Sequence, residues 1–136
     1  MKRVVLIACC GKKLSHRARA RDIYQSELFM RSLSYARRIK PDAIYILSAK
    51  YGLVDLDAEI EPYDVTLSRM STSDNRSWAE MVLGQLRARA SITDDHFIIL
   101  AGDRYRRHIV PNLASFEVPM SGLPIGKQLQ FLGAPR

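Results

Sequence analysis

The 136-residue sequence lacks several features that would restrict how the chain folds. Its only two cysteines, Cys9 and Cys10, are adjacent, so a disulfide between them would be strained and no long-range bridge can form. With only three histidines as well, the chain has no zinc-ligand spacing, and we expect no metal site. No apolar run approaches the roughly 20 residues that cross a membrane. We therefore expect a cytoplasmic protein without a membrane partner.

The glycine-rich motifs of common nucleotide enzymes are also missing. The chain contains neither a Walker A sequence, Gly-x-x-x-x-Gly-Lys-Ser/Thr, nor the Gly-x-Gly-x-x-Gly fingerprint of dinucleotide enzymes. An ordinary ATPase or dehydrogenase is therefore disfavoured, and we expect no cofactor.

Acidic residues are scarce in the first 40 positions. This segment has eleven Lys and Arg against two acids, whereas the rest of the chain has ten against twelve, so the net charge of +7 is a local property. A cluster of cations between positions 12 and 21 would attract phosphates through its field, although a solvated surface run is the alternative. The cluster consists of Lys12, Lys13, Arg17, Arg19 and Arg21.

The sequence does contain a regular alternation of apolar runs and helical patterns. Short continuous apolar runs predict buried parallel strands at 4–8, 43–47 and 97–101, with a weaker one at 115–118. Amphipathic patterns predict helices over 26–39, from Ser73 or Asp74 to about 90, after Gly102, and over 125–132. The series predicts a single three-layer α/β domain over 1–136, with a mostly parallel sheet of about four strands and helices on both faces.

In open parallel sheets, ligands bind outside the carboxyl ends of the strands. The loops selected by this rule are 9–21, 48–64, 102–107 and 120–126, and they hold most of the chemically unusual residues. The stretch 48–67 is the most informative, because loops of this length without regular structure are functional or disordered in most proteins. We therefore expect one composite site at this end of the sheet.

Three residues are candidates for catalysis. Asp64 is the best acid or base, and Lys50 is its natural partner. Such a pair can stabilise an oxocarbenium ion or activate water, as N-glycosidic cleavage requires, although a structural ion pair fits equally well. Cys9 could act as a nucleophile if a nearby lysine activates its thiolate; otherwise it is a small buried residue at the end of a strand.

The remaining candidates would bind the nucleotide or its phosphate. Gly11 would let the backbone approach a phosphate that Lys12 or Lys13 neutralises. Tyrosine rings could stack on a base, and the segment after Gly102 offers arginines and amides to an anion, unless it is only an ordinary helix start. The complete set is Cys10, Gly11, Lys12, Lys13, Arg21, Tyr24, Ser26, Ser48, Tyr51, Gly52, Pro62, Tyr63, Gly102 and Tyr105.

Four motifs together resemble a known family. They are Cys-x-x-x-Lys-Leu from Cys9, Ala-Arg-Asp-Ile-Tyr-x-Ser-x-Leu-Phe from Ala20, Leu-Ser-Ala-Lys-Tyr-Gly-Leu-Val from Leu47, and Glu-Pro-Tyr-Asp-x-Thr-Leu from Glu61. The chain resembles small bacterial and phage domains of unknown function related to the YaaA-like superfamily. This resemblance implies DNA binding and a link to peroxide stress, although the chain lacks the helix-hairpin-helix insertion of full-length YaaA proteins.

A second resemblance concerns the first motif and the residues that follow it. The arrangement is similar to a segment of archaeosine-synthase and deazaguanine-modification enzymes, and it would map onto Cys9, Lys13, Tyr24 and Ser26. Both resemblances imply recognition of a nucleobase. The chain has no separate RNA-binding domain of the kind found in those enzymes.

The sequence thus predicts an enzyme that recognises a nucleotide or a base in nucleic acid and performs N-glycosidic or base-modification chemistry. The expected partner is a nucleotide or a nucleic acid, with DNA favoured over RNA, and no oligomeric state is predicted. The alternative is a non-catalytic nucleic-acid-binding protein of stress response or phage defence. A weaker third hypothesis is a redox response through Cys9 and Cys10.

Overall fold

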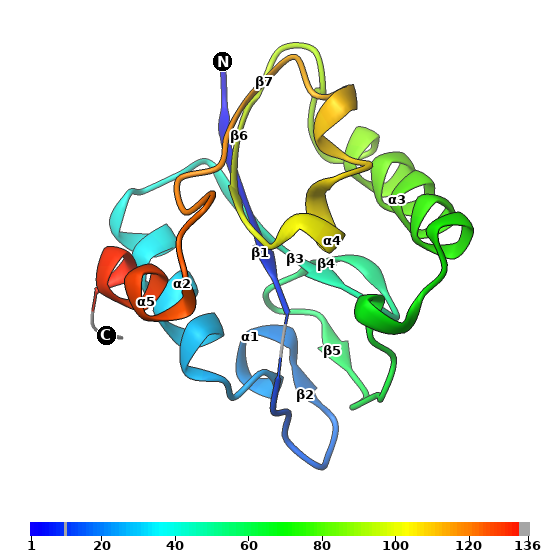
Figure 1. The fold of residues 1–136 in the computed structure, drawn as a ribbon, viewed down its shortest axis with the longest axis vertical. Helices are drawn as coiled ribbons and strands as arrows, with labels where there is room; N and C mark the ends of the chain where they lie inside the picture. The colour runs from blue at the N-terminus through cyan, green and yellow to red at the C-terminus, as the bar shows by residue number, and fades with distance from the viewer. Residues whose placement is uncertain (10, 134–136) are drawn as a thin grey trace.

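A five-stranded sheet forms the centre of the computed structural model, which describes residues 1–9 and 11–133 (Figure 1). The strand order is β4-β3-β1-β6-β7. β1 pairs in parallel with β3 and β6, and β6 pairs in parallel with β7, whereas β4 runs antiparallel along β3. The strands are β1 Arg3–Ala8, β3 Ala43–Ser48, β4 Gly52–Asp55, β6 His96–Leu100 and β7 Ser115–Glu117.

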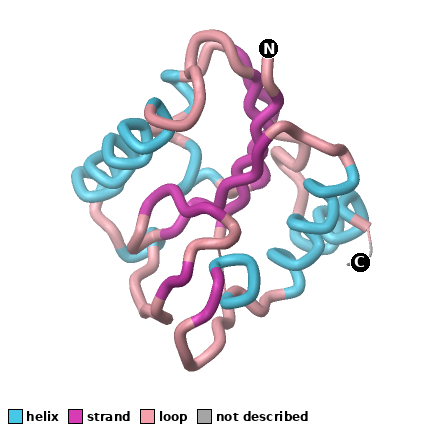
Figure 2. Tube along the Cα trace, turned by 180° about the vertical axis from the view of Figure 1, so that it is seen from behind, coloured by secondary structure: helices cyan, strands magenta, loops and turns pink. Residues whose placement is uncertain are grey.

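Helices cover both faces of this sheet, as predicted. α2 (Glu27–Arg38) and α5 (Ile125–Leu132) lie on one face, and α3 (Thr72–Arg87) lies on the other. Figure 2 shows the strands as a central layer between these two groups of helices. The shorter elements are α1 (Ala20–Ile23), α4 (Asp103–Arg106) and the 3-10 helices η1 (Leu67–Arg69) and η2 (Val110–Asn112). The predicted three-layer α/β architecture is therefore confirmed.

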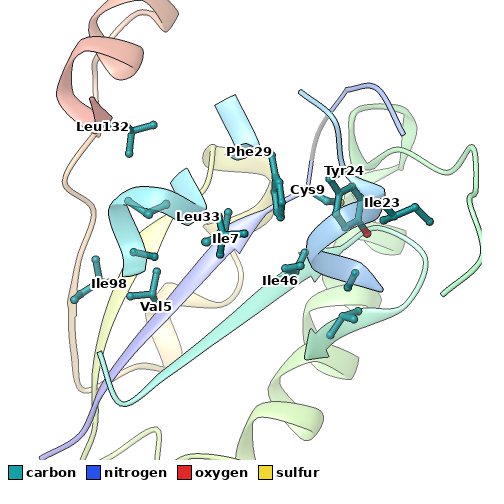
Figure 3. Packing of buried hydrophobic residues seen from close by; sticks show 14 of the residues in the cluster. Val5, Ile7, Cys9, Ile23, Tyr24, Phe29, Leu33, Ile46, Ile98 and Leu132 are labelled. Atoms are coloured by element: carbon teal, nitrogen blue, oxygen red, sulfur yellow. The ribbon is translucent and has the colours of Figure 1, made fainter. Parts of the chain in front are cut away.

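The core is divided into two clusters because side chains alternate along each strand. Val5 and Ile7 of β1 pack with the helices α2 and α5, whereas Val4 and Leu6 pack with α3. Figure 3 shows the first cluster, in which Phe29 of α2 lies over β1. All four of these β1 side chains are at most 1% exposed, which explains why this strand reads as a continuous apolar run.

Side-chain caps set the starts of the two long helices. The Ser26 hydroxyl accepts a hydrogen bond of 3.2 Å from the Phe29 amide, and this confirms the predicted start of α2. In α3 the cap is Ser71, whose hydroxyl accepts a 3.0 Å hydrogen bond from the Asp74 amide. The predicted cap at Ser73 or Asp74 is therefore wrong, because an equally suitable serine lies just upstream.

The segment 48–67 is more regular than the long loop predicted from the sequence. It forms β4, which adds a fifth strand, and then β5 (Glu59–Ile60), which pairs antiparallel with β2 (Ala18–Arg19). Backbone hydrogen bonds extend this small sheet, since the Ala20 amide donates to the Ala58 carbonyl at 2.8 Å. The pairing of β2 with β5 places the basic segment 12–21 beside the acidic segment 55–61, beyond the carboxyl end of β1 (Figure 1).

The turn between β3 and β4 is fixed by Gly52 and Gln85. Gly52 has φ +77°, and a Cβ atom added there would collide with the Gln85 side-chain oxygen and lie 2.8 Å from Met81 Cε. That oxygen accepts a 2.7 Å hydrogen bond from the Leu53 amide, while Gln85 Nε2 donates to the Tyr51 carbonyl at 3.2 Å. The turn therefore needs glycine both for its backbone conformation and for the approach of α3.

We predict that Gly52→Ala lowers the free energy of unfolding. The left-handed backbone alone costs an L-residue about 1–2 kcal/mol, and the collision with Gln85 adds to this cost. The matched control is Gly84→Ala, since an added Cβ at this exposed position in α3 contacts nothing within 4 Å and should stabilise the helix by up to about 1 kcal/mol. Urea denaturation measures both changes. An unchanged or increased stability of Gly52→Ala would contradict this account of the turn.

Candidate functional site

Four polar side chains meet at the carboxyl ends of β1 and β3, and we call them the Tyr63 cluster: Cys9, Tyr24, Ser48 and Tyr63. The Tyr63 hydroxyl lies 2.8 Å from Ser48 Oγ, 2.8 Å from the Tyr24 hydroxyl and 3.1 Å from Cys9 Sγ. Ser48 donates to Tyr63 and accepts a 3.1 Å hydrogen bond from the Tyr51 amide. One donor and two acceptor sites are all that a hydroxyl offers, so these three neighbours saturate the Tyr63 hydroxyl.

The sheet and its connections position this cluster. Cys9 directly follows β1, and its amide donates a 3.1 Å hydrogen bond to the Leu47 carbonyl at the end of β3. Ser48 is the last residue of β3, and its carbonyl accepts a 2.9 Å hydrogen bond from Trp78 Nε1 on α3. Tyr24 ends the short helix α1 beside the strand ends (Figure 3). Strand register therefore determines where the sulfur and the serine hydroxyl lie.

The tyrosines of the cluster hold their protons tightly. Tyr24 and Ser48 are 0% exposed and Cys9 is 3% exposed. Burial, and then the proximity of Cys9, raise the pKa of both Tyr24 and Tyr63 above the ordinary value of a phenol. At neutral pH both groups are protonated hydroxyls that can donate a hydrogen bond or a proton but cannot act as bases.

The predicted stacking rings contact one another and two lysines. Tyr63 packs edge to face against Tyr24 and Tyr51, with centroid distances of 6.5 Å and 5.7 Å. Lys13 Nζ lies 4.6 Å from the centroid of the Tyr63 ring, and Lys50 Nζ lies 5.3 Å from that of Tyr51. Lys13 is thus the residue of the basic segment that reaches the cluster, and base stacking by these tyrosines stays a prediction.

Asp64 and Lys50 do not form an ion pair with each other. Both side chains are exposed, and Asp64 makes no hydrogen bond or ion pair with any residue in the described ranges 1–9 and 11–133. The loop places Asp64 next to Tyr63 in the sequence, but outside the buried network. Its role as an acid or base stays a prediction that requires a bound substrate to bring the groups together.

Part of the predicted phosphate surface is neutralised within the molecule. Arg17 pairs with Glu61 at 3.3 Å, and Arg21 pairs with Asp57 at 3.2 Å, because β2 and β5 lie side by side. Lys12, by contrast, is exposed and remains accessible to an anion.

Several other predicted binding residues have structural roles. Gly11 has φ +72°, and an added Cβ would lie 3.2 Å from Cβ of Ser26, which itself caps α2. Gly52 permits the β3–β4 turn, and Pro62 is half-buried before Tyr63. Cys10 lies outside the described residues.

A cavity of about 520 Å³ lies at the carboxyl end of β6, and we call it the β6 cavity. Its volume is within the range of about 300–1,000 Å³ that is usual for small-molecule sites. Apolar side chains from β6, α2 and α5 form its floor, and the segment 102–107 adds Gly102, Tyr105, one acid and three arginines. The apolar lining residues include Ala8, Leu28, Ile99, Leu100, Val118, Met120 and Ile125.

Tyr105 joins the cavity to the Tyr63 cluster. Its ring lines the cavity, while its hydroxyl donates a 2.6 Å hydrogen bond to the Cys9 carbonyl and lies 3.8 Å from Cys9 Sγ. The ring also packs edge to face against Trp78, with a centroid distance of 5.8 Å. Tyr105 therefore connects the cavity to Cys9, which belongs to the cluster and does not itself line the cavity.

Sequence reasoning missed the contribution of α2 and α5 to the cavity. Ser32 of α2 and Gln128 of α5 both line it, and neither belongs to a loop that follows a strand. One signal was available for Ser32, since it is a polar residue on the buried stripe of α2 with Phe29, Leu33 and Ala36. No comparable signal marks Gln128.

The described residues include neither a membrane-spanning helix nor a group of side chains suited to a metal ion. None of the helices there is both long and apolar enough to span a membrane. Within the same ranges, no group of three or more His, Cys, Asp and Glu side chains could hold a metal ion.

We predict that Tyr63→Phe destabilises the fold, because it deprives Ser48, Tyr24 and Cys9 of a shared partner. Leaving buried polar groups unpaired costs about 1–3 kcal/mol. The control is Tyr45→Phe, since the Tyr45 hydroxyl has no hydrogen bond to another described residue, and a change within about 0.5 kcal/mol is expected. Equal stabilities of the two variants in urea denaturation would contradict the network.

The same variant should alter the response to alkali. The Tyr63 pKa is raised in the folded state, so the unfolded chain loses this proton first as the pH passes about 10. The contribution of Tyr63 to the stability of the wild-type protein is therefore complete below this pH and is lost as the pH rises toward the folded-state pKa. Tyr63→Phe should show a smaller loss between about pH 9 and 11, measured by urea midpoints, than Tyr45→Phe. Parallel losses in the two variants would argue against a buried, protonated Tyr63.

The comparisons with known proteins identify a family but no function. No curated protein and no solved structure matches the chain. One family model, described as a family of unknown function (DUF6884), matches residues 4–134. This range includes the Tyr63 cluster and all the residues that line the β6 cavity. The chain therefore belongs to the DUF6884 family of unknown function.

Proposed function

We propose that this protein is an enzyme that recognises a nucleotide or a nucleic-acid base and carries out N-glycosidic or base-modification chemistry at the carboxyl end of its sheet. The observation that carries the proposal is the β6 cavity, which combines an apolar floor with arginines at its rim and adjoins the Tyr63 cluster through Tyr105. Apolar walls suit a base, and guanidinium groups suit a phosphate.

The groups around Tyr63 could divide the work of glycosidic cleavage. The leaving base needs a hydrogen-bond donor. Tyr63 could serve if the base replaced one of the three neighbours of its hydroxyl, because the raised pKa keeps the phenol in its protonated form. As the N-glycosidic bond breaks, water would form the new bond to the anomeric carbon, and the exposed Asp64 carboxylate could take the proton of that water or stabilise the developing positive charge. Cys9 is the alternative nucleophile in place of water, and Lys13 provides a nearby cation.

The family resemblance supports the same class of ligand. Among the residues that resemble deazaguanine-modification enzymes, Cys9 and Tyr24 belong to the Tyr63 cluster. Lys13 lies against the rings of Tyr24 and Tyr63. Three of the four residues that carry this resemblance therefore lie at one place in the molecule.

A second candidate function is non-catalytic binding of nucleic acid. The charge of +7 favours it, as do Lys12 and Arg19, which are exposed in the basic segment. The ion pairs of Arg17 and Arg21 work against it, because these two arginines are already matched by carboxylates.

We predict that Asp64→Asn abolishes turnover and leaves binding largely intact. Release of a free base, or of a modified base, from nucleotides and DNA is followed by chromatography and mass spectrometry, and binding is measured by calorimetry. The control is Glu80→Gln, an equal charge change at an exposed position of α3, which should leave both unchanged.

Two outcomes would change the conclusion. Loss of binding together with turnover would make Asp64 a structural residue. If the wild-type protein turns over none of these substrates but binds DNA with a steep dependence on salt, the non-catalytic function is favoured instead.

A further inference from the structure

The β6 cavity bears on whether the ligand is a free nucleotide or a base held within a nucleic acid. We infer that the cavity holds one free nucleoside phosphate, with its base on the apolar floor and its phosphate at the rim, where Arg104 is the anchor. The inference rests on the proposed function and narrows the substrate from any nucleotide or nucleic-acid base to a free nucleoside phosphate.

The size and lining of the β6 cavity suit a single small ligand. Its volume of about 520 Å³ falls in the range of about 300–1,000 Å³ for small-molecule sites. Residues of α2, α4 and α5 bound it on different sides, among them Leu28, Arg104 and Ile125. Sites for single-stranded nucleic acid are instead grooves that follow a backbone over about 4–16 nucleotides.

The three arginines that line the cavity differ in how far their guanidinium groups are engaged. Arg107 pairs with Asp103 through a 2.9 Å hydrogen bond from Nε, and this contact holds the pKa of Asp103 below its usual range. Arg106 donates to the Ala101 carbonyl at 2.7 Å. Arg104 is exposed, and its guanidinium makes no hydrogen bond or ion pair with the residues that the structure describes.

The backbone of Arg104 is nevertheless held in place. Its carbonyl accepts a 3.0 Å hydrogen bond from Nδ2 of Asn75, which is 5% exposed on α3. The guanidinium therefore projects from a fixed point at the cavity. A guanidinium can bind a phosphate through two parallel hydrogen bonds, which suits a terminal phosphate better than a lysine would.

A serine hydroxyl lies at the end of the cavity formed by α2. Ser32 lines the cavity and is 2% exposed as a residue, and its side chain makes no hydrogen bond with another residue in 1–9 or 11–133. The hydroxyl is not among the fully buried polar atoms that lack a partner in these ranges, so the little surface it keeps is available to a polar atom of a ligand. Gln128 offers an amide on the α5 side, where its Nε2 donates to the Leu123 carbonyl at 2.8 Å and thereby fixes the side chain.

The electrostatics outside the cavity favour a free nucleotide over a strand. A strand would need a continuous row of available cations, but Arg17 and Arg21 are each engaged by a carboxylate of the segment around β5. A polyanion at these two arginines would compete with Glu61 and Asp57, a modest cost because such exposed ion pairs are worth at most about 1 kcal/mol, whereas a single phosphate at Arg104 displaces no side chain. Lys12 and Arg19 are also available, but the β6 cavity is where an unengaged guanidinium lies beside an apolar surface.

Calorimetric titration tests this inference. The probes are the monophosphates of adenosine, guanosine, cytidine and uridine, the four corresponding nucleosides, and single-stranded and duplex DNA 12-mers of mixed sequence. We expect at least one monophosphate to bind. Its nucleoside should bind at least about tenfold more weakly, because the charge-assisted contact with the phosphate is lost. The emission of Trp78, the only tryptophan, should change on binding through its contact with Tyr105.

Three variants localise the binding. Arg104→Gln should weaken the monophosphate about tenfold and leave the nucleoside unchanged, since only the phosphate contact is removed. Arg87→Gln, the same charge change at an exposed position of α3, should affect neither ligand. Ser32→Ala should weaken nucleoside and monophosphate alike, and urea denaturation should find it as stable as the wild-type protein.

The outcomes separate this inference from the proposed function on which it rests. Binding of the DNA 12-mers without binding of any monophosphate would overturn the inference and leave the proposed function standing. Monophosphate binding that Arg104→Gln and Arg87→Gln weaken equally would also overturn it, since the effect would then be one of net charge. Failure of all the nucleotides, nucleosides and DNA probes to bind would overturn both.

Discussion

The pairing of β1 with β3 and β6 is the constraint on which the candidate site depends. In this register Ala8 lies opposite Leu47 and Ile7 lies opposite Leu100, so the next residues of all three strands emerge at one edge of the sheet. Cys9 and Ser48 are two of these residues. A slip of one position would turn every side chain of a strand to the other face, and would separate the sulfur from the serine hydroxyl.

The site combines two environments, the Tyr63 cluster and the β6 cavity, which Tyr105 connects. In the Tyr63 cluster, buried hydroxyls and a thiol satisfy one another, and the low polarity around them keeps the phenols protonated. The β6 cavity is open to a ligand and carries cations at its rim. Tyr105 belongs to both, because its ring faces the cavity while its hydroxyl binds the Cys9 backbone. The two environments are therefore connected through this one side chain.

Local patterns were sufficient to predict the main strands and helices, but not the contacts that build the site. The apolar runs and the Ser26 cap act within a few residues, and both predictions are confirmed. β4 and β5 are short and polar at their ends, and only pairing with a partner strand defines them. The meeting of Tyr24 with Tyr63 joins positions 39 apart, and no periodicity encodes such a distance. The same holds for Ser32, whose importance depends on a cavity closed by distant elements.

Gln85 links the far side of the molecule to this edge of the sheet. Its amide holds both sides of the turn that presents the Tyr51 amide to Ser48, and Ser48 in turn holds Tyr63. The Trp78 side chain on the same helix holds the Ser48 carbonyl. Side chains of α3 thus hold the Tyr63 cluster in position through hydrogen bonds to Ser48 and to the turn between β3 and β4. Any movement of α3 would be transmitted to the Tyr63 hydroxyl through two hydrogen-bonded routes that converge on Ser48.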